Sequence, residues 1–414
     1  MSQTVSNLGE IMQEVFTAQR LEKQFFDEFR VFDKLRRVSK WTHGKYAKVP
    51  IHKGRSGGYS VKGSGGGTLN DADEQKVDSA TYTVGYNYQQ IEIEIAAINE
   101  ATGGGFSIGS AVNLEVDGAL SDIRNQVERQ FLGDNSGMIA EFTTNSNTTV
   151  LLLEPTGYGY DALKAGWIYP GLQIDAGTVS DPDSVTTAGF TVAAVSESPT
   201  TPSITTTLAE TTAPLDFASI RLAHNAGSAV SNESDGLRNI AGSTTGASGG
   251  LDPDTAGEGF WKPAHVDTTT TVLSLNLLLT LQRKITQKRG ARSQTALFSL
   301  YQRQNFYELL QSQVHFGGDN VSAGAEQDST WNGIGLESLP TVPDREVYML
   351  TLEDLAIVTG AKIKQPTWVS SIAGNNQGMI WKQGYTSFVD SLVYPVGLAT
   401  RRRNTHACAR GLTA

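Results

Sequence analysis

The chain has 414 residues, more than one domain of usual size, so we expect two or three structural units. Its net charge of −10 argues against a general nucleic-acid binder, because such proteins present a basic surface. The single cysteine, Cys408, excludes an intrachain disulfide and suits a cytosolic origin. No stretch approaches the ~20 apolar residues of a membrane span.

Charge is distributed unevenly along the chain. Residues 1–62 hold 12 Lys and Arg against 6 Asp and Glu, whereas residues 141–270 hold 4 against 15. A basic start and an acidic middle suit head-to-tail contacts between identical subunits. Charged side chains that only face solvent would explain the same pattern.

Residues 1–44 are predicted to form an N-terminal arm. Between residues 8 and 37 large apolar side chains recur at helical spacing, as at Leu21, Phe25, Phe29 and Phe32. This apolar stretch precedes any domain core. It is therefore either exchanged with a partner or docked on its own domain, and the sequence favours neither alternative.

Residues 45–95 carry the most informative pattern in the chain. Lys45–Lys53 and Ser79–Tyr88 are predicted strands, and the long segment between them is rich in glycine over residues 54–68. A hairpin that belongs to a domain core is closed by two to five residues, and an isolated two-stranded ribbon is marginally stable in water. The segment therefore predicts an extended arm, and a neighbouring subunit is expected to supply its missing surface.

The returning strand of this arm changes phase. Apolar side chains occupy even positions from Tyr82 to Tyr88 and odd positions from Ile91 to Ile95. Because side chains alternate between the two faces of a strand, the slip at Gln89-Gln90 predicts a bulge or a change of buried face, where an arm strand with a tyrosine face continues into a core strand with an isoleucine face. The alternative is two separate short strands with a break at Gln89.

A long amphipathic helix is predicted over residues 110–132, within a unit of residues 96–155. One apolar stripe runs from Val112 to Phe131, and Gly133 provides the expected terminator. The opposite face is polar, so we expect this helix to lie on a sheet.

Residues 156–226 change character. Regularly spaced short strands are predicted at Ala165–Gly171, Phe190–Val195, Ser203–Leu208 and Phe217–Leu222, separated by turns rich in Pro, Gly, Asp and Ser. The pattern predicts a small inserted β-barrel that closes without entering the core built by the long helix.

The last two segments complete an α+β chain. Residues 227–365 are predicted to hold helices near Leu273–Ile285, Phe306–Val314 and Leu352–Thr359, with a strand at Val347–Leu350. Residues 366–414 return to β structure, and the run Arg401 to Arg403 follows the last predicted strand.

No segment predicts an active site. The glycine-rich residues 54–68 lack the Gly-Lys-Ser/Thr ending of a phosphate loop. The six histidines show no metal-ligand spacing, and Cys408 has no Cys-X-X-Cys partner. We therefore expect no catalytic residue, no metal and no cofactor, although an enzyme such as a hydrolase remains the weakest of the competing interpretations.

In this order, the parts resemble the major capsid protein of tailed bacteriophages, with the Hong Kong 97 type coat fold. The runs Leu132-Gly133-Asp134, after the long helix, and Asp235-Gly236-Leu237, after the inserted module, are similar to that family. The resemblance implies an N-terminal arm (1–44), an extended loop (45–95), a peripheral domain with a spine helix (96–155), an inserted barrel (156–226), an axial domain (227–365) and a returning β segment (366–414).

The resemblance also implies a function. Such proteins assemble with themselves as hexamers and pentamers into an icosahedral shell that encloses double-stranded DNA without sequence-specific binding. A portal protein and scaffold or decoration proteins are the further expected partners, with no membrane involved. Assembly is expected in the host bacterial cytoplasm, and the final location is the virion. The alternatives are another structural virion protein, such as a tail-tube or decoration protein, and the shell of a bacterial nanocompartment.

Some members of that family crosslink a lysine of the extended loop to a neighbour's asparagine. No matching motif carries this chemistry over to Lys53, Lys62 or Lys76, so we expect no covalent crosslink. The candidate inter-subunit contacts are Lys53, Arg55, Lys62, Tyr82, Tyr86, Tyr88, Arg401, Arg402 and Arg403.

Overall fold

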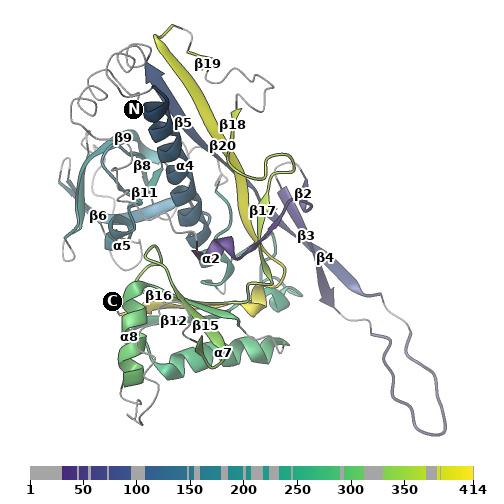
Figure 1. The fold of residues 1–414 in the computed structure, drawn as a ribbon. Helices are drawn as coiled ribbons and strands as arrows, with labels where there is room; N and C mark the ends of the chain where they lie inside the picture. The colour runs from purple at the N-terminus through teal and green to yellow at the C-terminus, as the bar shows by residue number, and fades with distance from the viewer. Residues whose placement is uncertain are drawn as a thin grey trace, which may run out of the picture.

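The computed structural model describes residues 30–43, 46–54, 57–71, 74–94, 108–146, 149–152, 159–178, 185–198, 202–206, 218–222, 233–243, 246–289, 293–311, 330–369, 380–382 and 384–413. Figure 1 shows a long sheet with a helix along it, a barrel beside that helix, a second sheet with its own helices, and a hairpin that projects well beyond the rest. Most of the predicted N-terminal arm, residues 1–29, lies outside the described residues.

The first sheet is built around β20 (Ser387–Thr400), a strand of 14 residues. Its core order is β1-β17-β20-β18, and β5 and β19 also pair with β20. The short helix α2 (Arg30–Asp33) leads into β1. The other strands are β1 (Arg36–Val38), β5 (Gly85–Glu94), β17 (Leu355–Thr359), β18 (Thr367–Trp368) and β19 (Ile380–Trp381).

The phase change in the returning strand lies earlier than the sequence predicts. Strand β5 pairs with β20 in unbroken register, and Tyr86 and Tyr88 face outward while Ile91 and Ile93 face inward. The prediction of a bulge or a change of buried face at Gln89-Gln90 is therefore wrong. The break lies at Val84, between β4 (Lys76–Thr83) and β5. Next to this break, β20 has a glycine, Gly397. A Cβ atom at that residue would lie 3.0 Å from the carbonyl oxygen of Thr83.

Helix α4 (Ile108–Leu132) agrees with the predicted spine helix to within two residues at its start. It lies along β5 and β20 (Figure 1). Ile123, Val127 and Phe131 are buried on its sheet-facing stripe, and Gly133 N closes the last turn on Arg129 O at 2.9 Å. A 3.6-residue apolar period therefore places this helix correctly from sequence.

The predicted barrel is present and closed, in the strand order β10-β7-β6-β11-β8-β9. Two of its strands precede residue 156, so the barrel begins directly after α4. Its strands are β6 (Met138–Ser146), β7 (Thr149–Leu152), β8 (Gln173–Thr178), β9 (Val185–Ser196), β10 (Ser203–Thr206) and β11 (Ala218–Leu222).

The barrel shares its core with the spine helix. Ile139, Leu163 and Ile174 are buried in the same apolar cluster as Phe131 of α4. The expectation that the module closes without entering that core is therefore wrong. The predicted strand Ala165–Gly171 is wrong as well, because these residues form turns after the short helix α5 (Gly159–Lys164), with Gly166 and Gly171 at positive φ.

The second sheet and two helices form what we call the α7/α8 unit. Helix α7 (Leu275–Arg289) begins where Ser274 Oγ accepts the Leu277 N–H at 3.2 Å, and helix α8 (Leu300–Gln311) follows. The sheet order is β12 (Ala264–Thr271), β21 (Ala407–Leu412), β16 (Glu346–Leu350), β13 (Thr295–Phe298), β15 (Ile334–Ser338) and β14 (Thr330–Trp331). The run Leu352–Thr359 is no helix, because it holds the buried strand β17.

The hairpin is the third sheet, with β2 (Thr42–His43), β3 (Tyr46–Gly54) and β4 in that order. Three short elements pack near its base: α6 (Leu237–Ile240) and the 3-10 turns η2 (Gly259–Trp261) and η3 (Arg403–Thr405). In the described part of the chain, no helix is long and apolar enough to cross a membrane.

Candidate functional site

The proximal half of the hairpin packs on its own subunit. Ala47, Val49 and Ala80, from β3 and β4, are buried in a cluster that also contains Leu251 and Trp261. The sequence-based expectation that a neighbour must supply this surface is therefore wrong for the hairpin base. The loop over residues 246–261 supplies it instead.

One residue of that loop, Gly249, receives the hairpin directly. Its carbonyl oxygen accepts the Thr81 N–H at 2.7 Å. Its φ is +63°, and a Cβ atom there would lie 2.8 Å from the ring of Tyr82. Only glycine combines this backbone conformation with this close approach, so residue 249 fixes how the hairpin leaves the body.

A buried carboxylate holds the same loop in place. Asp235 Oδ2 accepts hydrogen bonds from Ser248 Oγ and Gly249 N, both at 3.1 Å, and Oδ1 accepts from Asn135 Nδ2 at 2.8 Å and Asn239 Nδ2 at 3.1 Å. Burial raises the pKa of this carboxyl, although the four donors favour its charged form. Asp235 thus connects the end of the spine helix to the hairpin base.

Gly236 brings this carboxylate up to the spine helix. A Cβ atom there would lie 2.3 Å from Gln130 O and 2.4 Å from Gly133 O, distances that no side chain tolerates. The Arg238 N–H donates to Gly133 O at 3.1 Å. The runs Leu132-Gly133-Asp134 and Asp235-Gly236-Leu237 therefore meet in space and form one joint.

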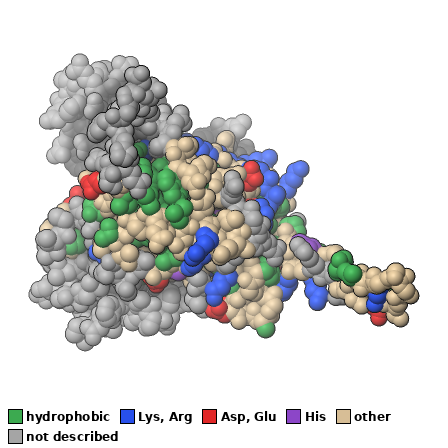
Figure 2. All heavy atoms as spheres, turned by 90° about the horizontal axis from the view of Figure 1, so that it is seen from below, with side chains coloured by type: hydrophobic (Ala, Val, Ile, Leu, Met, Phe, Trp, Pro, Cys, Tyr) green, Lys and Arg blue, Asp and Glu red, His purple; other side chains and the backbone are tan. Residues whose placement is uncertain are grey.

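The distal part of the hairpin has a different environment. Tyr59, Val61 and Leu69 are 81%, 77% and 69% exposed. Figure 2 shows the tip standing clear of the body, with hydrophobic, basic and acidic side chains among mostly uncharged atoms. Asn70 joins the two limbs, because its N–H donates to Ser60 Oγ at 2.9 Å and its Nδ2 to Tyr59 O at 3.0 Å. The tip is thus ordered across its limbs while its apolar side chains face solvent.

The three consecutive arginines after β20 have three different environments. Arg403 is fully buried and donates to the carbonyl oxygens of Asn239, Ile240, Ser243 and Gly246, at 2.7 to 3.1 Å. It therefore clamps the segment around α6 from inside the subunit.

Arg402 and Arg401 lie nearer the surface. Arg402 forms an ion pair with Asp354, with Nη2 2.9 Å from Oδ2 and Nε 3.0 Å from Oδ1. The guanidinium carbon of Arg401 lies 5.0 Å from the centre of the Trp41 ring, a cation–π contact, and the side chain is exposed. Among the described residues, no carboxylate forms an ion pair with Arg401.

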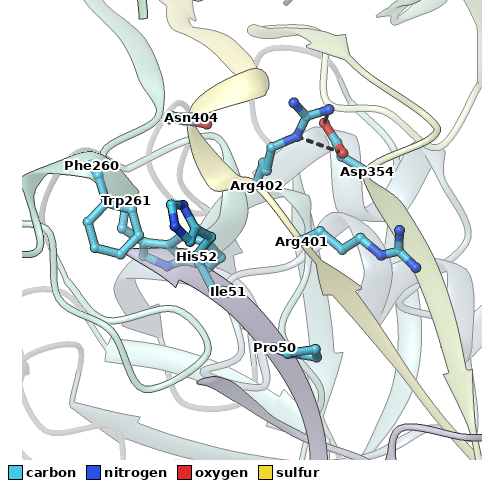
Figure 3. Close-up of a pocket in the computed structure, with 9 residues that line it drawn as sticks. All are labelled: Pro50, Ile51, His52, Phe260, Trp261, Asp354, Arg401, Arg402 and Asn404. Carbon is cyan, nitrogen blue, oxygen red and sulfur yellow. Dashed lines mark hydrogen bonds and ion pairs between the residues drawn. The ribbon is translucent and has the colours of Figure 1, made fainter. Parts of the chain in front are cut away.

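A cleft of about 300 Å³ opens at this point, between the hairpin base and the arginines. Figure 3 shows Pro50 and His52 of β3 along one side, Phe260 and Trp261 at another, and Arg402 and Arg401 across from them. Asn404 also lines the cleft, and its Oδ1 is buried without a hydrogen-bond partner among the described residues. The cleft therefore combines apolar side chains with a cation, Arg401, that has no carboxylate partner among the described residues.

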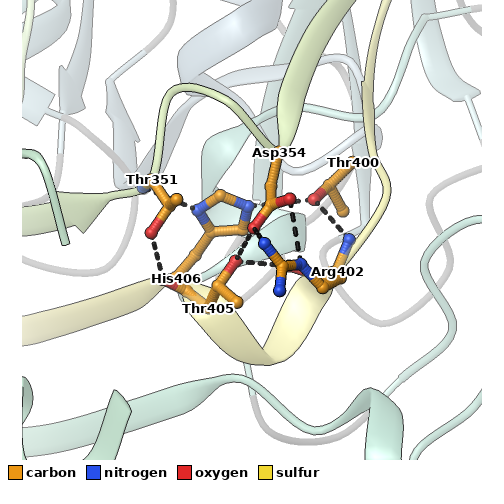
Figure 4. Close-up of polar contacts among 6 residues, drawn as sticks. All are labelled: Thr351, Asp354, Thr400, Arg402, Thr405 and His406. Carbon is orange, nitrogen blue, oxygen red and sulfur yellow. Dashed lines mark hydrogen bonds and ion pairs between the residues drawn. The ribbon is translucent and has the colours of Figure 1, made fainter. Parts of the chain in front are cut away.

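A network of polar contacts around the buried His406 lies next to Arg402 (Figure 4). His406 Nε2 lies 2.9 Å from Thr400 Oγ1, and the Thr351 N–H points at Nδ1 at 3.4 Å. Thr405 Oγ1 donates to Asp354 Oδ2 at 2.9 Å. Burial lowers the pKa of His406 to about 4, so the imidazole is neutral at neutral pH.

The nine candidate contact residues do not form one surface. Tyr82 and Arg403 are enclosed within the subunit, so intramolecular packing accounts for both. Lys53 pairs with Asp78 at 3.2 Å and Glu258 at 3.5 Å at the hairpin base. The exposed members are Lys62 at the tip, Tyr86 and Tyr88 on β5, Arg401, and the half-exposed Arg402. Arg55 lies outside the described residues.

Sequence reasoning missed the residues that hold the hairpin base. Asp235 and Gly236 stand out in the sequence only through the family resemblance. Trp261 sits in a stretch without periodicity, where its indole N–H donates to Ser248 O at 2.9 Å. In the described part of the chain, no group of three or more His, Cys, Asp or Glu side chains could hold a metal ion.

No protein-family model matches the chain, and no curated protein matches it. Solved structures do. A chain of the cyanophage A-1(L) capsid asymmetric unit matches with a TM-score of 0.51 at 12% identity, over 96% of this chain and 99% of that one. The holo-SrpI encapsulin complex from Synechococcus elongatus PCC 7942 matches with a TM-score of 0.48 at 8% identity, over 100% and 96%. A structure of Mycobacterium phage Adephagia matches with a TM-score of 0.47 at 9% identity, over 100% and 99%.

The match to the cyanophage capsid chain extends over nearly the whole length of both chains. It shows that this chain has the Hong Kong 97 type coat fold, in its mixed α+β form. The fold class predicted from sequence is confirmed.

Proposed function

We propose that this chain is the major capsid protein of a tailed bacteriophage, and that it assembles as hexamers and pentamers into an icosahedral shell around double-stranded DNA. The observation that carries the proposal is the hairpin tip. Its apolar side chains are 69 to 81% exposed, although a folded subunit gains by burying such groups. In a shell of identical subunits, a neighbour covers them.

The fold supports the same proposal. A chain of the cyanophage A-1(L) capsid has this fold over nearly its whole length. We propose that the hairpin serves as the extended loop, α4 as the spine helix, and the α7/α8 unit as the axial domain. The strands from β18 onward would form the returning β segment.

The barrel is proposed to lie on the outer face of the shell. Residues 138–222, from the first to the last strand of the barrel, hold 2 Lys and Arg against 9 Asp and Glu. An acidic surface is repelled by packed DNA and keeps particles soluble. A map of the assembled particle tests this placement, and barrel density on the inner side would contradict it.

Tip removal tests the assembly role. In the test variant, an Asn-Gly turn joins Gly54 to Lys76, two residues that already pair across the hairpin. The buried base is kept, so the subunit should fold with an unchanged midpoint of thermal unfolding. Shells seen by electron microscopy and sedimentation for the full chain should be absent for the variant. The matched control is Gly65→Ala, where a Cβ atom meets nothing within 4 Å, and it should assemble normally.

The contents of the assembled shells distinguish a virus capsid from a nanocompartment. Shells recovered from infected cells should hold double-stranded DNA at the density of a packaged genome. A shell of the same architecture that consistently encloses a protein would instead identify a nanocompartment. A full-length chain that stays a compact monomer under all conditions, with its virion partners present, contradicts both.

A further inference from the structure

We propose that the cleft at the hairpin base receives the return limb of a second copy's hairpin tip, with Asp71 of that copy paired to Arg401. This inference rests on the proposed shell function and specifies which surfaces meet. The cleft is the one lined by Pro50, His52, Phe260 and Arg401 in Figure 3.

The charge of the cleft calls for a carboxylate. Asp354 already neutralises Arg402, Gln75 contacts the ring of His52 at 2.7 Å, and Asp78 and Glu258 neutralise Lys53. Among the described residues, this leaves Arg401 as the cation of the cleft without an anionic partner. Its guanidinium rests against Trp41, so the side chain is held in place before a partner arrives. A planar, preorganised guanidinium binds a carboxylate well.

The rest of the cleft fits an apolar side chain. Pro50 and Phe260 offer apolar surface for it. The required occupant is therefore an exposed segment that carries an apolar side chain and a carboxylate on one face.

Residues 69–71 of the hairpin tip match this description. Asn70 turns its side chain toward the opposite limb, where it bonds Tyr59 O. In an extended chain the neighbours of such a residue point the other way, so Leu69 and Asp71 present a shared outer face. Both are exposed, and among the described residues Asp71 has no ion-pair partner.

These complementary surfaces cannot meet within one subunit. The cleft is lined by Pro50 and His52 of β3, whereas Asp71 lies on the distal part of the hairpin, five residues from Lys76, the last residue of β4 that pairs with β3. Those five residues span at most about 18 Å when extended, so the loop holds Asp71 away from the cleft of its own subunit and leaves it exposed to an adjacent one. A contact between opposite ends of identical molecules is heterologous, and it closes into rings when the rotation between subunits allows.

A charge exchange tests the pairing. Arg401→Glu and Asp71→Arg should each reduce assembled particles at least tenfold, and the double variant should recover most of them because the pair is restored with reversed polarity. The matched control combines Asp71→Arg with Arg283→Glu, which has the same total charge but places the acid on the exposed surface of α7. That control should stay as defective as Asp71→Arg alone.

A disulfide provides a second readout. Cys408, the only native cysteine, is fully buried, so the unaltered chain should not crosslink under mild oxidation. The variant with Leu69→Cys and Pro50→Cys should form a ladder of covalent multimers, and each single variant should give no product larger than a dimer.

The outcomes separate this inference from the shell function. If the unaltered chain forms shells but the double exchange restores nothing and no ladder appears, the pairing is wrong while the function stands. If Arg401→Glu leaves shell yield unchanged and lowers only the retained DNA, the arginine contacts phosphate and the pairing is again wrong. If the unaltered chain never assembles, both proposals fail.

Discussion

The hydroxyl of Tyr82, on the hairpin, donates a hydrogen bond of 3.1 Å to the carbonyl oxygen of Thr400, at the end of β20. Burial raises the pKa of this phenol far above its ordinary value, so it stays protonated as a donor. The contact joins the projecting hairpin to the central strand of the body. The direction of the hairpin is therefore set inside the subunit, before any neighbour is present.

Removing this hydroxyl should loosen the hairpin base. Tyr82→Phe should lower the free energy of unfolding by about 1 kcal/mol, the usual loss for one buried hydrogen bond. Chemical denaturation of unassembled subunits measures the change. Tyr88→Phe, on an exposed ring, is the matched control and should stay within about 0.5 kcal/mol of the unaltered chain. Equal effects for the two variants would contradict the role given to Tyr82.

Replacing glycine by alanine should change the stability of the subunit in opposite directions at Gly236 and Gly118. Gly236→Ala drives a methyl group into Gln130 O and Gly133 O and should cost at least about 2 kcal/mol, or prevent folding. Gly118→Ala, in α4, meets open space and should stabilise the subunit by about 0.5–1 kcal/mol, because alanine favours helix. Thermal unfolding compares them, and a harmless Gly236→Ala would show that the joint tolerates a side chain.

Arg403 should not be replaceable by lysine. A lysine ammonium cannot reach all four carbonyl oxygens that the planar guanidinium binds, so buried acceptors lose their donor. We expect Arg403→Lys to cost about 3 kcal/mol in the free energy of unfolding. The control Arg37→Lys affects an exposed pair with Asp33 and should cost less than about 0.5 kcal/mol. Similar costs would mean that charge alone matters at residue 403.

His406 should make the subunit sensitive to mild acid. Its pKa is about 4 in the folded subunit, below the ordinary value of about 6.5, so the unfolded chain binds the proton more readily. The free energy of unfolding is therefore unaffected by this group above pH 6.5. As the pH falls from 6.5 toward 4, that free energy decreases by about 3 kcal/mol in total.

A variant isolates that contribution. His406→Gln can still hydrogen bond but cannot titrate, so its free energy of unfolding should fall less steeply between pH 6.5 and 4. Circular dichroism at pH 8 checks that the variant is folded. Identical slopes for the variant and the unaltered chain would assign the acid sensitivity to other groups.

Strong periodicity made part of this fold predictable from sequence. The spine helix follows from an apolar stripe at 3.6-residue spacing, and the hairpin follows from two alternating strands around a glycine-rich segment. The helix predicted at Leu352–Thr359 was wrong for a physical reason. Strand β17 is buried on both faces, so its apolar run has no alternation to distinguish a strand from a helix.

The packing of the hairpin base and its cleft could not be predicted from the sequence for a different reason. The hairpin base is held by the carbonyl oxygen of Gly249 and by the side chains of Leu251 and Trp261, which lie in a stretch of sequence without periodicity. Arg401, Arg402 and Arg403 are identical in sequence, yet one stacks on an indole, one pairs with a carboxylate and one is enclosed by carbonyl oxygens. Such differences arise from tertiary contacts, which a local pattern does not contain.

Hydrogen bonds brace the passage from α4 into the barrel. Asp134 Oδ1 accepts from both the N–H and the hydroxyl of Ser136, and Ser136 Oγ accepts the Met138 N–H at 3.2 Å. The Asn135 side chain is held by Asp235, and the apolar core continues across the passage. Polar contacts and one continuous core therefore join the barrel to the helix, so we expect a displacement of the barrel to carry the helix with it.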